Sequence, residues 1–258
     1  MSINTYSKFY YGIEITADNC KMDFDEGAGE LTATLDYGTY TPEEIADEVA
    51  LQLNAAGALT YTCTFNRTTR ILTITSNTSV EMLFDTGTNS AESAYTTLGF
   101  STAADDTDTS FVAASACCEV YSPQYILQSY VPVENYIEQL HATVNETVTG
   151  RQELITFGDM QMTRFNINFI TDISQPSGGP ITNNASGVAD VLSFLSWITK
   201  KNKIEFMPDS ATASAYMNLV LDANVASKTG TTMRLKELYD KGLSGYYETE
   251  LLTFRRVT

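Results

Sequence analysis

TYTPEEIADEVALQLNAAG, residues 39–57, is the clearest helix pattern in the chain, and TYTCTFNRTTRILTITS, residues 60–76, follows it closely. Thr41 is a good N-cap, because its hydroxyl can accept a hydrogen bond from a backbone N–H that has no partner within the helix. Pro42 suits the first helical position, and Glu44 stands where the side chain of a capping box returns to the N-cap backbone. The first stretch therefore predicts a helix with a well-defined start.

Both stretches have one apolar side. The helix repeats apolar residues every four positions, at Ile45, Val49 and Leu53. The second stretch alternates with period two on either side of a turn at residues 66–69, and its apolar members are Tyr61, Cys63, Phe65, Leu72 and Ile74. Residues 9–16, FYYGIEIT, also alternate and predict a further strand. These periods predict a helix packed across a small antiparallel sheet.

Two groups of acidic residues lie in predicted turns and loops of the first half. Asp23, Asp25 and Glu26 lie at the turn over residues 26–29, and Asp105, Asp106 and Asp108 lie in the polar segment 101–116. The first group lacks the Asx pattern and the distal Glu of a calcium loop. We interpret the first group as a solvated turn and the second as an exposed loop, with cation binding as the alternative for each.

The net charge of −17 is unevenly distributed along the chain. Residues 1–125 hold 18 acidic and 4 basic side chains, whereas residues 126–258 hold 14 acidic and 11 basic ones. An acidic surface repels phosphate backbones, so the composition argues against specific nucleic-acid recognition. No apolar run approaches the ~18 residues of a membrane-spanning helix, and no signal-peptide pattern opens the chain. We therefore expect no membrane insertion and folding in a cytoplasm.

The amino-acid composition changes between residues 118 and 132, where aromatic and β-branched residues surround two prolines. We predict a boundary there, between an acidic module over residues 1–120 and a β-rich domain over residues 121–258. A second helix is predicted at residues 186–200; its apolar face is Val188, Val191, Leu192, Leu195 and Ile198, broadened by Phe194 and Trp197. Strands without regular βαβ alternation predict the α+β class, mainly antiparallel, in two β-rich domains that each carry one prominent amphipathic helix.

The chain offers little catalytic chemistry. His141 is the only histidine, which excludes a multi-histidine metal site and favours a structural or surface role. No serine stands in a GxSxG elbow, and the glycine-rich segments lack the order of a phosphate-binding loop. We interpret the four cysteines, Cys20, Cys63, Cys117 and Cys118, as free buried thiols. We interpret Arg255 and Arg256, near the C-terminus, as strand-end or subunit contacts. We expect no catalytic residue, no metal and no cofactor, and hence no enzyme.

Three elements of the first half together resemble a module of tailed-bacteriophage virion proteins. They are the capped helix from Tyr40 to Asn54, the hairpin Tyr-x-x-x-Phe-Asn-x-x-Thr-Arg-x-x-x-Ile from Tyr61 to Ile74, and the closing signature Leu98-Gly99-Phe100. The match covers residues 9–112. The second half is similar in pattern to tail-tube and distal-tail proteins, and this resemblance implies a β-barrel with one crossing helix.

The resemblance implies a structural protein of a phage tail, near its distal end or baseplate, located in the virion and assembled in the host cytoplasm. Its expected partners are copies of itself in a ring and other tail or baseplate proteins. The family supplies no catalytic residue. The acidic first half would face solvent or the tube lumen, where negative charge lets DNA slide past, and the more neutral second half would form subunit interfaces.

Other readings stay open at this point. One is another virion part, such as a tail-tube subunit, a connector or a head decoration protein. Another is a carbohydrate- or host-binding module whose Tyr-rich loops make the contacts, and the last is an enzyme. Ring assembly favours the virion readings, glycan binding by a monomer favours the binding module, and turnover that is lost on mutating one acidic residue favours an enzyme.

Overall fold

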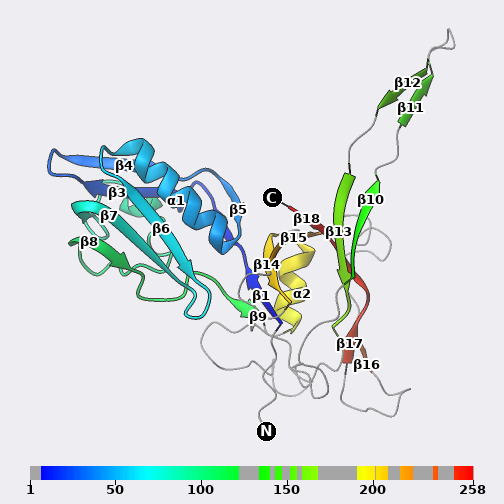
Figure 1. Cartoon of the computed structure of the whole chain (residues 1–258). Helices are drawn as coiled ribbons and strands as arrows, with labels where there is room; N and C mark the ends of the chain where they lie inside the picture. The colour runs from blue at the N-terminus through cyan, green and yellow to red at the C-terminus, as the bar shows by residue number, and fades with distance from the viewer. Residues whose placement is uncertain are drawn as a thin grey trace.

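The structure is a computed structural model, and it describes residues 7–121, 134–139, 143–146, 152–155, 159–167, 191–200, 202–208, 216–222, 235–237 and 247–257. These residues form mainly antiparallel sheets with two α-helices, which confirms the predicted α+β class (Figure 1). In this part of the chain no helix is both long enough and apolar enough to cross a membrane.

A group of strands around helix α1 (Pro42–Ala56) forms what we call the first body. Its strands are β2 (Ile13–Ile15), β3 (Lys21–Asp25), β4 (Glu30–Thr34), β5 (Gly38–Tyr40), β6 (Tyr61–Asn66), β7 (Ile71–Met82) and β8 (Asp106–Val112), with a short 3-10 helix, η1 (Ser90–Glu92). The main sheet has the order β4-β3-β7-β6, and β8 pairs with β7, while β2 pairs with β5. The predicted helix and hairpin are thus confirmed as α1 with β6 and β7.

Helix α1 begins as the sequence predicts. The Thr41 hydroxyl accepts a hydrogen bond from the Glu44 N–H at 3.4 Å, and a Glu44 carboxylate oxygen accepts one from the Thr41 N–H at 2.8 Å. At the other end, the Asn54 side chain donates to Tyr61 O and accepts from Tyr61 N–H, at 2.8 and 2.9 Å. The start of β6 is therefore fixed directly to the end of the helix.

One hydrophobic core fills the first body, and we call it core 1. The predicted apolar face of α1 is fully buried in it, with Ile45, Val49 and Leu53 each at 0% exposure. The residues that pack against this face come from the strands and from the loops between them, including the Leu98-Gly99-Phe100 signature. They include Phe24, Leu72, Ile74, Tyr95, Leu98, Phe100 and Phe111. The three elements that carry the sequence resemblance therefore share a single core.

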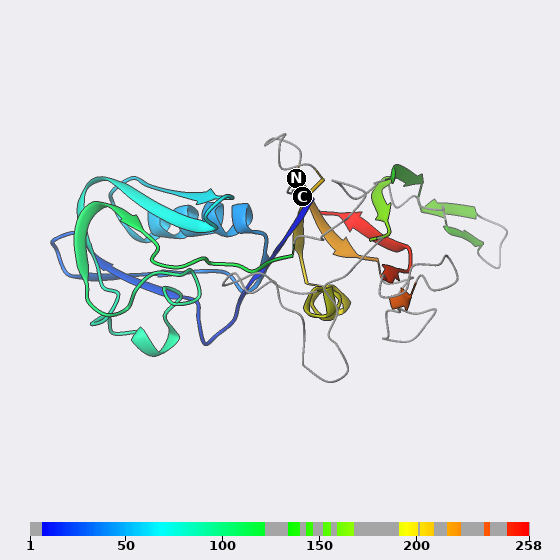
Figure 2. The same cartoon turned by 90° about the horizontal axis from the view of Figure 1, so that it is seen from below.

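The second body is a seven-stranded antiparallel sheet with helix α2 (Val191–Thr199) packed on it. Its strands, in sheet order, are β10 (Glu134–Gln139), β13 (Asp159–Phe165), β18 (Leu252–Arg256), β15 (Met217–Leu221), β14 (Ile204–Met207), β1 (Lys8–Tyr11) and β9 (Val120–Tyr121). Two ribbons complete the described part, β11 (Thr143–Glu146) with β12 (Gln152–Ile155), and β16 (Leu235–Glu237) with β17 (Tyr247–Thr249). Figure 2 shows the two bodies as separate masses joined by a narrow connection.

Core 2 lies between this sheet and α2. Of the predicted helix face, Val191, Leu195 and Ile198 are buried, whereas Val188 and the side chain of Leu192 lie outside what the structure describes. Phe194, predicted only to broaden the face, is at 0% exposure; its ring stacks with Tyr121 and lies tilted against Phe9. The aromatic members of core 2 therefore make this helix a packed element of the fold.

Three sequence predictions need correction. The expected β-barrel is not closed among the described strands, because the seven-stranded sheet ends at β10 on one side and at β9 on the other. Residues 9–16 form two strands in different sheets, not one, since the chain changes sheet at Gly12. The segment expected to be an exposed loop contains β8, which pairs with β7 although nearly all of its residues are exposed.

The division into two domains at residue 120 stays a prediction. The strand pairing shows, however, that one strand from the first range belongs to the sheet of the second body. Strand β1 lies within the predicted first range, 1–120, yet it pairs with β14 on one side and with β9 on the other. The first body is therefore inserted in the chain between two adjacent strands of the second body's sheet.

Replacing Thr41 by alanine removes the oxygen that accepts the Glu44 N–H. We expect the free energy of unfolding to fall by about 1 kcal/mol, measured by urea unfolding of the full chain followed by circular dichroism. Thr107→Ala, at an exposed position of β8, is the matched control, and it should change the value by less than about 0.5 kcal/mol. Equal effects of the two changes would contradict the role of the cap.

Replacing Leu195 by alanine opens a cavity between α2 and the sheet. Leu195 is 6% exposed, so we expect a loss of about 2–5 kcal/mol in the free energy of unfolding. Leu195→Asp should cost more, because it buries a carboxylate without a partner. Leu251 is 51% exposed, and Leu251→Ala should therefore be nearly silent. A silent Leu195→Ala would show that α2 is not packed as described.

Candidate functional site

Strand β1 supplies alternate side chains to the two cores. Phe9 and Tyr11 belong to core 2, whereas Tyr10 belongs to core 1, because successive residues of a strand point to opposite faces. In the ladder with β14, Tyr10 lies opposite Glu205, and Met207 also belongs to core 1. One face of this sheet therefore packs on α2, and the other meets the first body.

The chain passes from one body to the other at Gly12. Its N–H donates to Lys203 O at 3.0 Å. A Cβ at this position would lie 2.7 Å from Lys203 O and 2.7 Å from Tyr40 O, closer than real Cβ atoms come to other atoms. Any side chain would therefore push apart the backbones of the two bodies, and glycine is required here by close approach.

An ion pair joins the bodies beside this crossing. The carboxylate of Glu205 is fully buried, and its oxygens lie 2.7 Å from Arg67 Nε and 3.4 Å from Arg67 Nη2. Arg67 Nη2 also lies 2.8 Å from a carboxylate oxygen of Glu43, at the start of α1. The guanidinium also lies 4.1 Å from the ring centroid of Tyr216, and the Tyr10 hydroxyl donates to Arg67 O at 3.2 Å. Arg67, in the β6–β7 turn, is thus held from several elements at once.

Lys203 makes a second set of contacts across the junction. Its ammonium lies 3.0 Å from both carboxylate oxygens of Glu44, the residue that also closes the capping box at Thr41. Its carbonyl oxygen accepts hydrogen bonds from Gly12 N–H and, at 3.1 Å, from the Trp197 indole. Lys203 therefore links the start of α1, the crossing strand and α2.

The pKa values of both members of the buried ion pair are raised, which disfavours the charged form of Glu205 and favours that of Arg67. Burial raises the pKa of Glu205, and the hydrogen bond and charge of Arg67 offset this only in part. Burial lowers the pKa of Arg67, but the bond and charge of Glu205 more than compensate, so that its pKa is raised and it stays charged. Burial, followed by the charge of Glu205, raises the pKa of Tyr10 to about 12. Burial thus disfavours the charged form of Glu205, whereas Arg67 stays charged.

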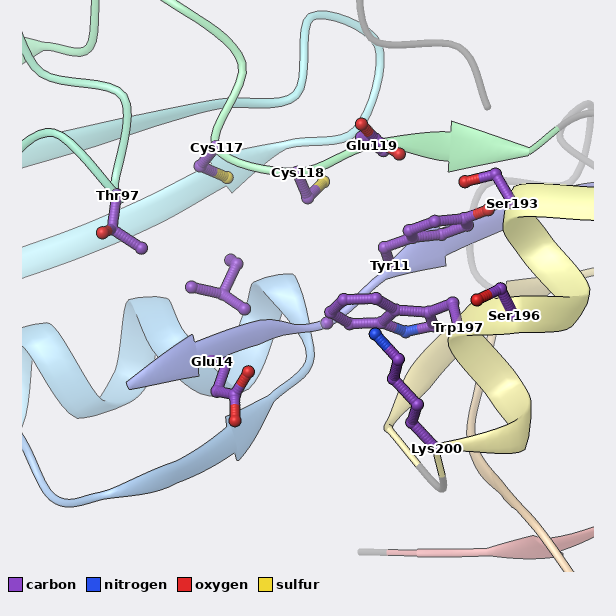
Figure 3. Close-up of a pocket in the computed structure, with 12 residues that line it drawn as sticks. Tyr11, Glu14, Thr97, Cys117, Cys118, Glu119, Ser193, Ser196, Trp197 and Lys200 are labelled. Carbon is purple, nitrogen blue, oxygen red and sulfur yellow. The ribbon is translucent and has the colours of Figure 1, made fainter. Parts of the chain in front are cut away.

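A cleft of about 440 Å³ opens at the junction (Figure 3). On one side Tyr11 and Trp197 stack with ring centroids 5.2 Å apart, and on the other lie Cys117 and Cys118. The remaining lining residues are Gly12, Ile13, Glu14, Thr97, Glu119, Ser193, Ser196 and Lys200. Its volume is in the range of small-molecule sites, about 300–1,000 Å³, and it mixes an aromatic wall with polar groups.

The acidic residues near the turn over residues 26–29 hold loops in place. Asp25 accepts hydrogen bonds from the backbone N–H groups of Gly27 and Gly29, at 2.6 and 3.0 Å. Glu26 accepts hydrogen bonds from the backbone after α1 and from a core tyrosine; the donors are Ala58 N–H, Leu59 N–H and the Tyr61 hydroxyl. Burial raises the pKa of Glu26, but these three hydrogen bonds together outweigh it and lower the pKa below its ordinary value.

The second acidic group has a similar use. Asp105 accepts hydrogen bonds from the backbone N–H groups of Asp85 and Thr86, at 2.7 and 3.2 Å, and it also contacts the Thr86 hydroxyl. Asp106 and Asp108 lie on the exposed strand β8. No group of three or more metal-ligating side chains occurs within the described ranges. Asp105 therefore satisfies backbone donors of the loop that follows β7.

The remaining residues discussed in the sequence analysis are the histidine, the cysteines and the two C-terminal arginines. His141 lies outside the described residues. All four cysteines are free, and burial raises the pKa of Cys63 to about 12, which keeps its thiol protonated. Arg255 lies 3.4 Å from Asp222, and Arg256 donates to the Thr163 hydroxyl, so both contact neighbouring strands of their own sheet.

Sequence reasoning missed the pair that joins the bodies. Arg67 and Glu205 are 138 positions apart, and Arg67 was assigned only to a turn. One signal was present, since Glu205 interrupts the otherwise apolar strand Ile204–Met207. A carboxylate at such a position needs a buried partner, but nothing local says which one.

No protein-family model matches the chain, and no curated protein sequence matches it.

Replacing Glu205 by glutamine removes a buried group that titrates. Because its pKa is raised in the folded state above the ordinary 4.5, the wild type holds a proton that the unfolded chain has released, and its stability falls as pH rises from about 4.5 through the raised pKa. Glu205→Gln lacks this loss. Unfolding of both chains between pH 4 and pH 8 should therefore show the wild type losing stability relative to the variant, and a constant difference would contradict this assignment.

Proposed function

We propose that the chain is a structural component of a bacteriophage tail, in the distal-tail or baseplate region. The observation that carries the proposal is the module formed by α1, the β6–β7 hairpin and the signature Leu98-Gly99-Phe100. Leu98 and Phe100 are buried in core 1, and Gly99 has a φ of 87°. A Cβ on Gly99 would also collide with Ser115 O. The residues that carry the resemblance are thus the ones this fold needs.

The construction of the first body suits a repeated subunit. Its loops are fixed by carboxylates that accept backbone hydrogen bonds, from Asp25, Glu26, Glu30 and Asp105. Charge-assisted bonds of this kind are stronger than neutral ones and hold defined geometry. A block whose loops are held in this way presents the same surface in every copy of an assembly.

A ribbon in the second body supports assembly through contacts between copies. Strands β11 and β12 pair from Thr143 with Ile155 to Glu146 with Gln152, and in Figure 1 they lie beyond β10 and β13, away from both cores. A two-stranded ribbon is marginally stable by itself. Packing against a neighbouring copy would stabilise it, and this supports a ring formed by the second body. The near-neutral charge of the second half suits such an interface, and the acidic first half suits a surface facing solvent or a lumen.

Sedimentation of the purified chain, alone and mixed with tail partners, tests the proposal. We expect particles much heavier than the 28.4 kDa monomer. A variant in which an Asn-Gly turn replaces residues 143–155 should lose assembly while its circular dichroism keeps the signal of the two bodies. Thr107→Ala, far from the ribbon, should assemble as the wild type does. A chain that stays monomeric with every tail fraction and enters no particle would contradict the proposal.

Another position in the virion, as a tail-tube subunit, a connector or a head decoration protein, would fit the same assembly. A host-carbohydrate-binding module is a separate candidate, and one observation favours it. The cleft has an aromatic wall of Tyr11 and Trp197 beside polar side chains, and aromatic faces with polar neighbours are suited to sugars. Glycan-array binding by a monomer that never assembles would favour this candidate over the structural one.

A further inference from the structure

The contact between the two bodies is narrow. The cleft beside Trp197 lies on one side of it, and a second cleft of about 490 Å³ borders it near Arg67. The second cleft is lined from β1, the β6–β7 hairpin and β14, by residues that include Lys8, Tyr10, Phe65, Arg67 and Met207. A small contact flanked by two clefts leaves room for the bodies to rotate against each other.

Within the described residues the chain crosses between the bodies at two places. The first is Gly12. The second is near Cys118, because Cys117 N–H is still bonded to Arg70 O in the first body, whereas Glu119 O accepts from Tyr11 N–H in the second. Both crossings lie at the same end of the β1–β9 pair, which is the geometry of a hinge.

Between described residues, two ion pairs span this hinge. One joins Arg67 to the fully buried Glu205, and the other joins the partly exposed Lys203 and Glu44. The Tyr10 hydroxyl also donates to Arg67 O across it. The Lys203–Glu44 pair has no fully buried member, with side chains 28% and 21% exposed, so salt screens it more than the pair that contains Glu205 at 0% exposure. The Arg67–Glu205 pair is therefore the polar contact on which the relative orientation depends most.

We propose that the Arg67–Glu205 pair is the lock of a hinge between the two bodies. With the pair formed, the first body is held at the angle seen here. With the pair broken, the first body pivots about Gly12 and Cys118, and the cleft beside Trp197 opens.

The burial of Glu205 gives the lock two distinct states. An unpaired carboxylate inside the junction is costly, so Glu205 is either paired with Arg67 or exposed to water by opening. Several charged or titratable groups face the pair, from α1, the β6–β7 turn, β1, the loop before β9, and the residues just before β14 and β15; they are Glu43, Glu44, Arg70, Tyr10, Cys118, Lys203 and Tyr216. Of these, Glu43 and Glu44 oppose ionisation of Glu205.

The direction of pH dependence follows from these groups. Burial raises the pKa of Glu205, so lowering the pH neutralises it before ordinary carboxyl groups. A neutral Glu205 can remain buried without Arg67. Loss of Arg67 should therefore open the hinge at high pH and leave it closed at low pH, and loss of both charges should leave it closed throughout.

Trp197 gives the readout. It is the only tryptophan, it is half-buried at the cleft, and its indole donates to Lys203 O in the hinge. We propose to measure acrylamide quenching of the full-length chain at pH 8 and pH 5, together with its radius of gyration by small-angle scattering. At pH 8, Arg67→Ala should raise the quenching constant by at least about twofold, because the open state, normally a minor one, becomes populated. At pH 5 the increase should be smaller, because Glu205 becomes neutral at a higher pH than an ordinary carboxyl group.

Two further variants make the result specific. The double variant Arg67→Ala, Glu205→Gln should return the quenching constant at pH 8 to the wild-type value. Arg164→Ala removes an exposed ion pair with Glu134 elsewhere in the second body and should change nothing. Circular dichroism identifies any variant that fails to fold, in which case the comparison uses Arg67→Lys, which keeps a charge but loses the paired geometry. Unchanged quenching in folded Arg67 variants at pH 8, or no rescue by the second substitution, would overturn the proposal.

Discussion

The architecture depends on one strand that belongs to two cores. Phe9 and Tyr11 enter core 2 while Tyr10 enters core 1, so β1 is the wall between them. The same alternation on β14 directs Glu205 toward the first body, where Arg67 neutralises it. Without that pair, a carboxylate at 0% exposure would be buried against an apolar surface. The orientation of the two bodies and the two clefts beside the junction follow from this arrangement.

The excess of acidic residues in the first half has a structural use beyond surface charge. Several carboxylates accept hydrogen bonds from backbone N–H groups in loops that have no strand or helix to satisfy them. An unpaired backbone donor is costly wherever it is withdrawn from water, and a carboxylate is the strongest acceptor available to it. A body built in this way keeps its shape through local contacts, which is the property that a repeated structural subunit needs.

The first body is an insertion between two neighbouring strands. Tyr10 pairs with Val120 across β1 and β9, so the chain leaves the second body's sheet and returns to it at adjacent positions. This topology separates two roles within the proposed tail protein. In that proposal, the sheet of the second body, with its projecting ribbon, would supply contacts between copies, and the inserted acidic module would supply the outward surface. The angle between them is set at the junction, which makes the junction the natural place for control of that surface.

The sequence by itself determined the local elements. The capping box at Thr41, the apolar repeats of α1 and α2, the β6–β7 hairpin and the α+β class all follow from spacing within a few residues, where propensity and periodicity act directly. Local spacing did not predict four features of the fold. They are the strand break at Gly12, the pairing of β1 with β14, the open edge of the expected barrel and the Arg67–Glu205 pair. Each depends on partners far apart in the chain, and period-two alternation is the same whichever sheet a strand joins. Only the tertiary structure decided which face of each strand met which core, because burial and charge pairing are settled by the packing of distant segments.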